Sequence, residues 1–262
     1  MTAVLPTVTA LTYLTPLREG GSLPGIVEAD DLGTYVVKFT GAGQGTKALT
    51  AEIVVGELAR RLGIRTPELK LIMVDSEMGR RDPDEEVNDL ITKSAGINLA
   101  VDFLPGSLGF DRLMHVDAVD AGPILWLDGL VANVDRSARN TNLLLWGTPD
   151  RPRTRALWAI DHGTCLRFHH AWGNPGAFAR SRYRWDDHVL GHSGSAADVH
   201  DRLAPAVTAA MLDEVIALVP EPWLLPDPDR PDARAPTDAE TARAAYRDYL
   251  LTRLDAAEAW LP

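Results

Sequence analysis

A polar segment of the chain, residues 133–140, lies between two apolar regions. The residues before it, 124–132, have the periodicity of a helix. After it come two apolar stretches, 143–146 and 156–160, separated by turn-forming Gly, Pro and Asp residues, which is typical of a β-hairpin. The polar segment is therefore predicted to be a loop that connects a helix to a hairpin.

The spacing of oxygen-bearing side chains in this loop indicates its chemistry. Asp135 is followed five residues later by Asn140, shortly before an apolar strand. In phosphoryl transfer a carboxylate orients the attacking hydroxyl or accepts its proton, and an Asn amide oxygen can ligate magnesium. The alternative is a simple turn, because Asn and Asp are common in turns after helices.

An earlier strand carries a lysine that needs a partner. Residues 34–39 are rich in β-branched and aromatic side chains and are predicted to form a strand that contains Lys38. A lysine among apolar residues is costly unless its charge is matched, although Lys38 can instead lie on the solvent face of the strand. The helix predicted next, 46–62, carries Glu52 on its apolar face, so we expect Glu52 to meet Lys38. Glu57 is expected to be a solvated surface charge.

A second carboxylate strengthens the prediction of a metal site. Asp161 directly follows the second apolar stretch and precedes Gly163 by two residues, so its side chain can project into a cleft. Magnesium prefers carboxylate and phosphate oxygens and keeps several waters, so few protein ligands are needed. Asp161 taken alone favours an ordinary Asp-x-Gly turn, but the complete order of Lys, Glu, Asp, Asn, hairpin and Asp is much rarer by chance than any one of these features.

The chain divides into a strand-rich part and a helix-rich part. Further segments with strand character are 68–74, 90–93 and 99–103. The strongly charged residues 79–88 are predicted to be an exposed loop, and helical periodicity appears at 111–119. After residue 165 the chain is mostly helical, up to a final helix at 238–260 capped by Thr237. We therefore predict an α+β fold, with an N-terminal lobe of residues 1–103 and a helical C-terminal lobe of residues 104–262.

Composition excludes several classes of function. The formal net charge is −11, whereas general nucleic-acid binders normally present a basic face. No apolar run approaches the ~20 residues of a membrane span, and the N-terminus is a poor signal peptide. Cys165 is the only cysteine, so an intrachain disulfide is impossible. We therefore expect a cytoplasmic protein with no nucleic-acid partner and no membrane span.

At this point the chain resembles the HipA-like kinases, which share the bilobal protein-kinase-like fold with phosphoinositide kinases. The resemblance extends from about residue 18 to residue 161, and more loosely to the C-terminus. The segment Asp135–Arg–Ser–Ala–Arg–Asn140 is especially close to the catalytic loop of that family. The other segments that carry it are 18–24, 35–39, Glu52 with 57–63, and 160–163.

The resemblance implies ATP and Mg²⁺ as cofactors and assigns roles within the loop. Asp135 would be the catalytic base, and Asn140 and Asp161 would be the magnesium ligands. Lys38 would hold the α- and β-phosphates of the nucleotide, with Glu52 as its partner.

The resemblance also implies a nucleotide-binding region in the N-terminal lobe. Gly20, Gly21 and Ser22 would form the loop over the nucleotide, with Ser22 as a candidate autophosphorylation site. Residues 99–104 are our candidate for the adenine-contacting linker between the lobes, with contacts expected from Val101, Phe103 and Leu104.

The chain departs from the usual kinase pattern in ways that leave its acceptor open. Asn133 and Val134 stand where His and Arg usually precede the catalytic Asp, and His162 stands where Phe is usual. The expected reaction is transfer of a phosphoryl group from ATP to a hydroxyl, most naturally on Ser or Thr of a protein or of the chain itself. Lipid and small-molecule acceptors remain open.

Other readings of the sequence compete with this one. A degenerate kinase fold could bind nucleotide without turnover, although the intact set of Lys, Asp, Asn and Asp favours turnover. Ser193, in Gly191–His–Ser–Gly–Ser195, nearly matches the nucleophile elbow of a serine hydrolase, but Ser195 replaces the last Gly. The basic run 180–184 is either a packed, partly exposed segment or a patch that contacts substrate.

Overall fold

The chain packs as two compact units, which we call the barrel unit and the helical unit. The computed structural model describes residues 4–18, 22–43, 45–81, 83–148, 151–226 and 232–262. The barrel unit comprises Val4–Leu49 and Pro67–Pro105, and the helical unit comprises Thr50–Thr66 and Gly106–Pro262. The functional boundary predicted between residues 103 and 104 stays a prediction.

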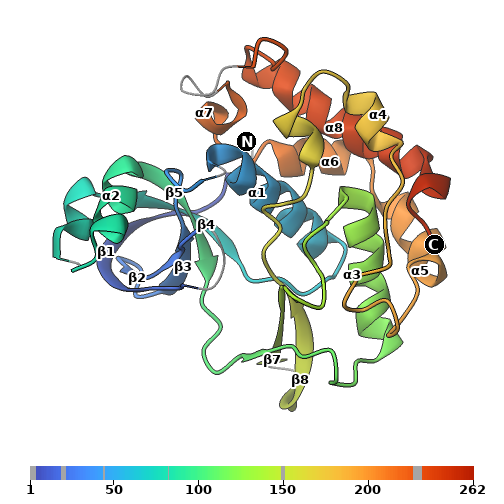
Figure 1. Ribbon diagram of the computed structural model, residues 1–262, viewed down its shortest axis with the longest axis horizontal. Helices are drawn as coiled ribbons and strands as arrows, with labels where there is room; N and C mark the ends of the chain where they lie inside the picture. The colour runs from blue at the N-terminus through green and yellow to red at the C-terminus, as the bar shows by residue number, and fades with distance from the viewer. Residues whose placement is uncertain (1–3, 19–21, 44, 82, 149–150, 227–231) are drawn as a thin grey trace. The chain divides into compact units, whose positions relative to one another are not determined.

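The barrel unit is built on short strands that close on themselves (Figure 1). Their order around the barrel is β1, β2, β3, β5, β4, and all neighbouring pairs are antiparallel except β1 with β4. The strands are β1 (Thr7–Pro16), β2 (Gly25–Ala29), β3 (Thr34–Lys38), β4 (Leu69–Val74) and β5 (Gly96–Asp102). The strands predicted within 34–39, 68–74 and 99–103 are therefore confirmed.

Alternation along β3 determines which of its side chains enter the barrel core. Tyr35 and Val37 are buried, whereas Val36 and Lys38 are half-buried on the opposite face. The core also receives Val87 and Ile91 from helix α2 (Glu85–Lys93), which follows a 3₁₀ turn at Ser76–Arg81.

Two predictions fail at this helix. The charged stretch 79–88 is largely helical rather than a loop, because Asp84 caps α2 and accepts a hydrogen bond from Glu86 N at 3.0 Å. The segment 90–93 is the end of α2 and not a strand, since its apolar residues continue the helical spacing of Val87.

The helical unit combines helices with a small sheet. Its sheet has the order β6 (Leu108–Gly109), β7 (Leu143–Thr148), β8 (Arg151–Ala159), so the predicted hairpin is confirmed. Helix α1 (Gly45–Arg61) belongs to this unit from Thr50 onward. The other helices are α3 (Ala118–Val131), α4 (Pro175–Ala179), α5 (Ala197–Leu203), α6 (Ala209–Ile216), α7 (Glu221–Leu224) and α8 (Ala239–Asp255).

Two further boundaries differ from the sequence predictions. Helix α3 begins at Ala118, so Pro123 lies inside it and the helix predicted at 111–119 is mostly irregular backbone. Pro123 is the sixth residue of α3, so its missing N–H costs the helix one i→i−4 hydrogen bond, yet the helix continues past it to Val131. The cap of α8 is Asp238, which accepts from Thr241 N at 2.8 Å, and not Thr237.

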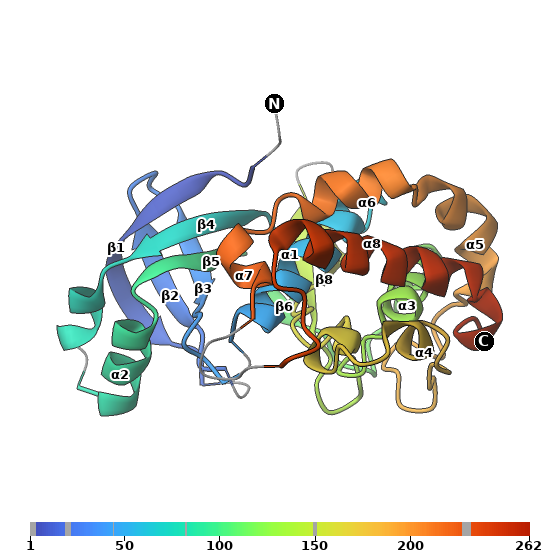
Figure 2. The ribbon, with the colours of Figure 1, turned by 90° about the horizontal axis from the view of Figure 1, so that it is seen from above.

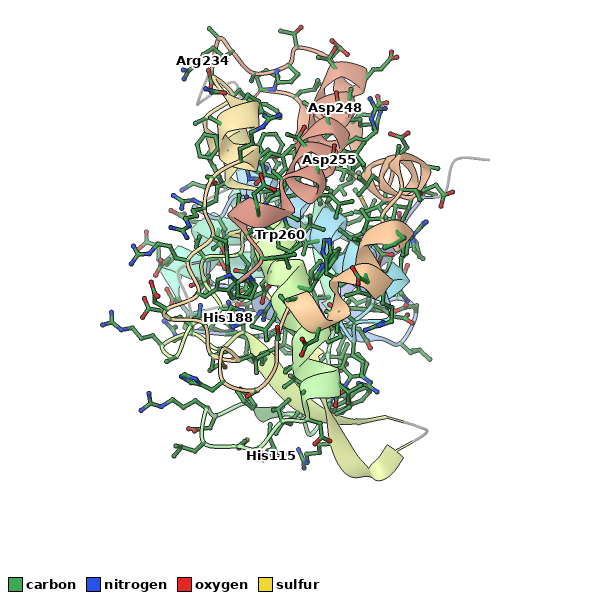
Figure 3. The ribbon with its side chains drawn as sticks, turned by 90° about the vertical axis from the view of Figure 1, so that its right-hand side faces the viewer. His115, His188, Arg234, Asp248, Asp255 and Trp260 are labelled. Carbon is green, nitrogen blue, oxygen red and sulfur yellow. The ribbon has the colours of Figure 1, made fainter. Side chains whose placement is uncertain are left out.

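The C-terminal residues are packed into the core of the helical unit. Helix α8 runs beside α6 (Figure 2), and Trp260 lies just beyond its end (Figure 3). The Trp260 ring meets Trp126 of α3 edge-on at 5.5 Å, and its Nε1 donates to Arg253 O at 2.6 Å. Arg253 is itself fully buried and donates to Gly129 O at 2.8 Å, so α8 is fixed against α3 by both apolar packing and hydrogen bonds.

In the part of the chain that the structure describes, no helix is both long enough and apolar enough to span a membrane.

Candidate active site

A fully buried ion pair supports the polar loop. Asp128, in the last turn of α3, accepts from Arg136 Nε at 2.6 Å, and neither side chain has any exposed surface. Burying a charge is costly unless it is paired and hydrogen-bonded. The loop residue Arg136 is therefore anchored to helix α3 by its own charge.

Two further side chains complete the surroundings of Asp128. His188 Nε2 lies 3.0 Å from Asp128 Oδ2, and Asn133 Nδ2 donates to Oδ1 at 2.8 Å. The backbone N–H of Leu190 donates to His188 Nδ1 at 3.1 Å, so the proton of this imidazole is on Nε2, which donates to Asp128. The carboxylate thus receives hydrogen bonds from three side chains.

These partners determine the protonation state of Asp128. Burial by itself raises the pKa of this carboxyl, but the charge of Arg136 and the hydrogen bond from His188 outweigh burial and hold the pKa well below its ordinary value. Asp128 is therefore ionised throughout the neutral range, and Arg136 has a permanent counter-charge.

The predicted loop residues Asp135 and Asn140 lie in direct contact. Asn140 Nδ2 donates to Asp135 Oδ2 at 2.8 Å, and Asn142 Nδ2 donates to the same oxygen at 3.2 Å. The backbone N–H of Asp135 donates to Asn133 Oδ1 at 3.0 Å. The carboxylate of Asp135 is therefore oriented by two amides, and its backbone is tied through Asn133 to the buried Asp128.

Arg136 also joins the loop to the end of the hairpin that carries Asp161. Its guanidinium donates to the carbonyl oxygen of Asn142 and, at 3.3 Å, to that of Ile160. The next residue, Asp161, has a left-handed backbone with φ of 56°. Non-glycine residues adopt this conformation rarely, and it persists where surrounding contacts enforce it, often at functional sites.

Glu52 lies in the same unit as Asp161 and contacts its neighbour. This carboxylate is buried on α1, and its Oε1 accepts from the backbone N–H of His162 at 3.0 Å. Sequence reasoning did not anticipate this contact. The expected pairing of Glu52 with Lys38 stays a prediction, and Lys38 is half-buried at the end of β3 in register with Leu99 of β5.

The other residues predicted to bind nucleotide belong to the barrel unit. Ser22 is exposed, Val101 and Phe103 are half-buried, and Leu104 is buried. Gly20 and Gly21 lie outside the described residues. Nothing in these positions tests their expected roles.

The environment of Ser193 argues against the hydrolase alternative. A nucleophile elbow needs a strand before the serine and a helix directly after it. Residues 185–190 form turns rather than a strand, and Ser193 lies in a turn, where its N–H donates to Leu190 O at 2.8 Å. The nearby His200 is engaged elsewhere, because its Nδ1 accepts from Trp126 Nε1 at 3.0 Å.

Sequence reasoning missed Asp128 and His188 as supporting residues. A signal existed for Asp128, since it is a lone acid in the apolar run 124–131. For His188 there was no such signal, because its contact with Asp128 joins residues far apart in the chain.

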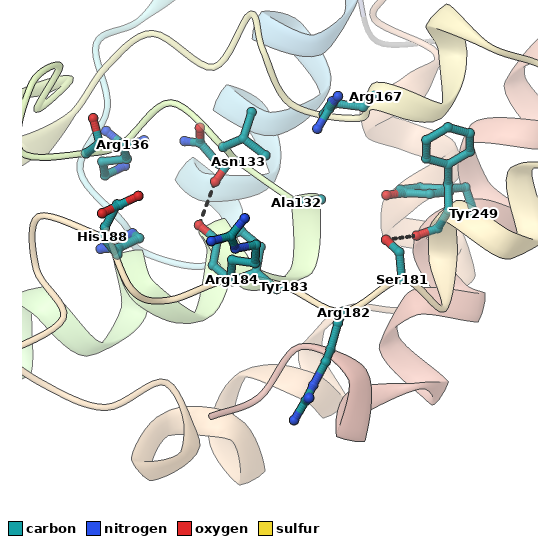
Figure 4. Close-up of a pocket in the computed structure, with 14 residues that line it drawn as sticks. Ala132, Asn133, Arg136, Arg167, Ser181, Arg182, Tyr183, Arg184, His188 and Tyr249 are labelled. Atoms are coloured by element: carbon teal, nitrogen blue, oxygen red, sulfur yellow. Dashed lines mark hydrogen bonds between the residues drawn. The ribbon is translucent and has the colours of Figure 1, made fainter.

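A cavity of about 520 Å³ adjoins the polar loop within the helical unit (Figure 4). Loop residues Asn133, Val134, Arg136 and Ser137 form one part of its wall. The remaining wall comes from the end of α3, from α4 with the segments before and after it, and from α8. These residues are Ala132, Arg167, Phe178, Ser181, Arg182, Tyr183, Arg184, Asp187, His188 and Tyr249.

Within the described ranges, no group of three or more His, Cys, Asp or Glu side chains is arranged to hold a metal. The predicted magnesium ligands are of a different kind, one amide oxygen and one carboxylate, which suits an ion that retains waters and phosphate oxygens.

Comparison with known proteins shows the family of the chain. No curated protein matches it. Among solved structures, a proinflammatory kinase of Helicobacter pylori, CtkA, aligns with a TM-score of 0.49 and 12% identity, over 98% of this chain and 95% of that chain. The Golgi casein kinase aligns with a TM-score of 0.47 and 11% identity, and its form with Mn/ADP bound with 0.48 and 12%; both alignments cover 98% of this chain and 74% of that one.

The family model described as HipA-like kinase matches residues 12–253. This match includes the polar loop, the hairpin and Asp161, and it extends over nearly the whole chain. The predicted α+β class, with a β-rich N-terminal region and a helical C-terminal region, is confirmed. The chain therefore belongs to the HipA-like kinase family.

Proposed function

We propose that this protein transfers the γ-phosphoryl group of Mg-ATP to a hydroxyl, on Ser or Thr of a protein or of the chain itself. The observation that carries the proposal is the orientation of Asp135 by Asn140 and Asn142, in a loop that the buried Asp128–Arg136 pair anchors. Phosphoryl transfer depends mainly on positioning and electrostatics, so a rigidly held carboxylate is the feature that it requires.

Asp135 is proposed to orient the acceptor hydroxyl and to accept its proton. Among the described residues, both hydrogen bonds to this carboxylate end on Oδ2. Oδ1 is therefore left to accept from an incoming hydroxyl. A base must come within hydrogen-bond reach of the proton that it removes, and the two amides limit rotation of the carboxylate away from that position.

Asn140 and Asp161 are proposed to hold Mg²⁺. Asn140 donates a hydrogen bond from Nδ2 to Asp135, which leaves its amide Oδ1 as a potential ligand of Mg²⁺. Together with the carboxylate of Asp161, this provides the hard oxygen donors that the ion prefers. Magnesium, when bound, neutralises charge on the phosphate oxygens. The contacts of Arg136 with Asn142 O and Ile160 O support a fixed relation between the two ligand-bearing segments.

The barrel unit is proposed to supply the rest of the nucleotide site. Lys38 would hold the α- and β-phosphates with Glu52 as its partner. Gly20, Gly21 and Ser22 would cover the phosphates, with Ser22 as a candidate autophosphorylation site. Val101, Phe103 and Leu104 would contact the adenine. Membership of the HipA-like kinase family supports these assignments.

Transfer of ³²P from γ-labelled ATP to the chain tests the proposal. We expect Mg²⁺-dependent labelling that falls about 10²- to 10⁴-fold in Asp135→Asn, the range associated with loss of a general base. Nucleotide affinity, measured by calorimetry, should change little in this variant. Asp198→Asn, an exposed acid on α5, is the control and should label like wild type. Wild-type protein that binds Mg-ATP but labels neither itself nor any added protein would favour the degenerate-kinase alternative.

A further inference from the structure

The cavity beside the polar loop adjoins the backbone segment that carries Asp135. Val134 and Arg136, the two chain neighbours of Asp135, both line it. Tyr183, on the opposite wall, donates from Oη to Asn133 O at 2.5 Å (Figure 4). The wall formed by residues 178–184 is thus hydrogen-bonded to the loop that carries the proposed base. A volume of about 520 Å³ is also typical of cavities that accept ligands.

The charge of the lining is opposite to that of the whole chain. The formal net charge of the protein is −11, yet Arg167, Arg182 and Arg184 line the cavity against one acid, Asp187. Across the residues that the structure describes, no carboxylate pairs with Arg167 or Arg182. Arg184 has only a surface contact with Asp186 at 3.8 Å, between side chains that are 85% and 79% exposed. Such a contact contributes little, so these cations remain available for a ligand.

A tyrosine hydroxyl in the cavity wall provides a second and independent indication of a ligand. Tyr249 of α8 is only 3% exposed, and its ring stacks on Phe168 at 4.2 Å. Its Oη makes no hydrogen bond to any described residue and is directed into the cavity (Figure 4). Because the ring is held in place by packing and the hydroxyl faces the cavity, this group is suited to a ligand that accepts a hydrogen bond.

We propose that this cavity, with Arg167, Arg184 and Tyr249, binds the acceptor, and that the acceptor is a peptide segment in which acidic residues flank the Ser or Thr. The inference rests on the proposed function and names its substrate class. Carboxylates accept hydrogen bonds from both guanidinium and phenol donors.

The distribution of charge favours an acidic peptide over a compact anion. Arg167 and Arg184 come from different segments, on either side of α4, and Arg167 is exposed, as Arg184 is. Arg182 extends away from both of them (Figure 4). Cations that do not converge on one point suit several carboxylates spaced along a chain. Apolar side chains also line the cavity, since Val134 is 57% exposed and the half-buried Phe178 is part of the lining.

Binding measured without nucleotide tests the inference directly. Two fluorescein-labelled peptides would share one central Ser and differ only in flanking Glu or Gln residues, and fluorescence anisotropy would report their affinities. We expect the Glu peptide to bind about tenfold more tightly at low salt, with the preference shrinking as ionic strength rises. Arg167→Gln and Arg184→Gln should each weaken binding of the Glu peptide about two- to fivefold, the range for exposed charge pairs. Tyr249→Phe, which keeps the ring, should weaken it by a similar factor.

A matched control and the kinase assay separate the inference from the proposed function. Arg202→Gln removes an exposed arginine of α5 outside the cavity and should not change binding. Equal affinity for the two peptides, or equal losses in Arg202→Gln and Arg167→Gln, would overturn the inference. Phosphorylation of glycerol phosphate in preference to the Glu peptide would also overturn the inference. Selective binding of the Glu peptide without phosphate transfer would support the inferred acceptor site and would contradict only the proposed kinase activity.

Discussion

Replacement of Asp128 by Asn should destabilise the helical unit strongly. The substitution keeps the size of the side chain but removes its charge, which leaves Arg136 buried without a counter-ion. It also replaces one acceptor oxygen with an NH₂ group. Because Oδ1 accepts from Asn133 and Oδ2 accepts from both Arg136 and His188, either orientation of the new amide places two donors against each other.

The magnitude follows from the burial of the pair. Neither Asp128 nor Arg136 has any exposed side-chain surface, so water cannot replace the lost partner. Breaking a buried ion pair by removing one member costs about 3–5 kcal/mol. With a urea m-value of about 2 kcal/mol/M, that loss lowers the unfolding midpoint by about 2 M.

Tryptophan fluorescence is a suitable assay because it reports one unit. All seven tryptophans of the chain lie within residues 106–262, so their emission follows the unfolding of the helical unit. Asp201→Asn, at an exposed position on α5, is the matched control and should change the free energy of unfolding by less than about 0.5 kcal/mol. A loss below about 1 kcal/mol in Asp128→Asn would refute the role given to the pair.

The difference between wild type and Asp128→Asn should also depend on pH. The folded-state pKa of Asp128 is depressed below its ordinary value of 3.8, so its stabilising contribution is complete above that value and is lost as the pH falls through the folded-state pKa. The deficit of the variant should therefore be constant between about pH 5 and pH 8 and should shrink below about pH 4. A deficit that grew on acidification would contradict the assignment of an ionised Asp128.

Three further predictions concern other positions in the helical unit. Trp260→Ala removes the fully buried ring that packs on Trp126, and should cost about 3–5 kcal/mol in urea unfolding; a cost below about 1 kcal/mol would show that the C-terminus is not an anchor. Burial raises the pKa of the Cys165 thiol, so iodoacetamide should label this residue at pH 8 only after unfolding, and rapid labelling of the native protein would contradict its buried position. Ala132 ends α3 with φ of 54°, so Ala132→Gly should raise the unfolding free energy by up to about 1 kcal/mol, whereas a loss of more than 1 kcal/mol would argue against that backbone conformation.

Local patterns in the sequence were sufficient to predict most elements near the site. The β-branched and aromatic residues around Lys38 and the apolar stretches 143–146 and 156–160 correctly predicted β3 and the β7–β8 hairpin. The failures occurred where one local signal competed with another. The charges of 79–88 indicated a loop, yet the Asp84 cap and the inward-facing Val87 were enough to form α2.

The supporting network of the loop was beyond local prediction. The contact between Asp135 and Asn140 follows from their spacing within one loop. By contrast, the bond from His188 to Asp128 and the bond from His162 N to Glu52 join residues 60 and 110 positions apart. Such contacts depend on how helices and loops pack together, which no periodicity or spacing encodes.

The most direct test of the proposed site is the location of the metal. A crystal of the protein with Mn²⁺ and a non-hydrolysable ATP analogue would reveal the ion by its anomalous signal. We expect a peak about 2.0–2.3 Å from both Asn140 Oδ1 and a carboxylate oxygen of Asp161, next to the phosphates of the analogue. A metal and triphosphate bound elsewhere, with Asn140 and Asp161 both far from the ion, would contradict the account.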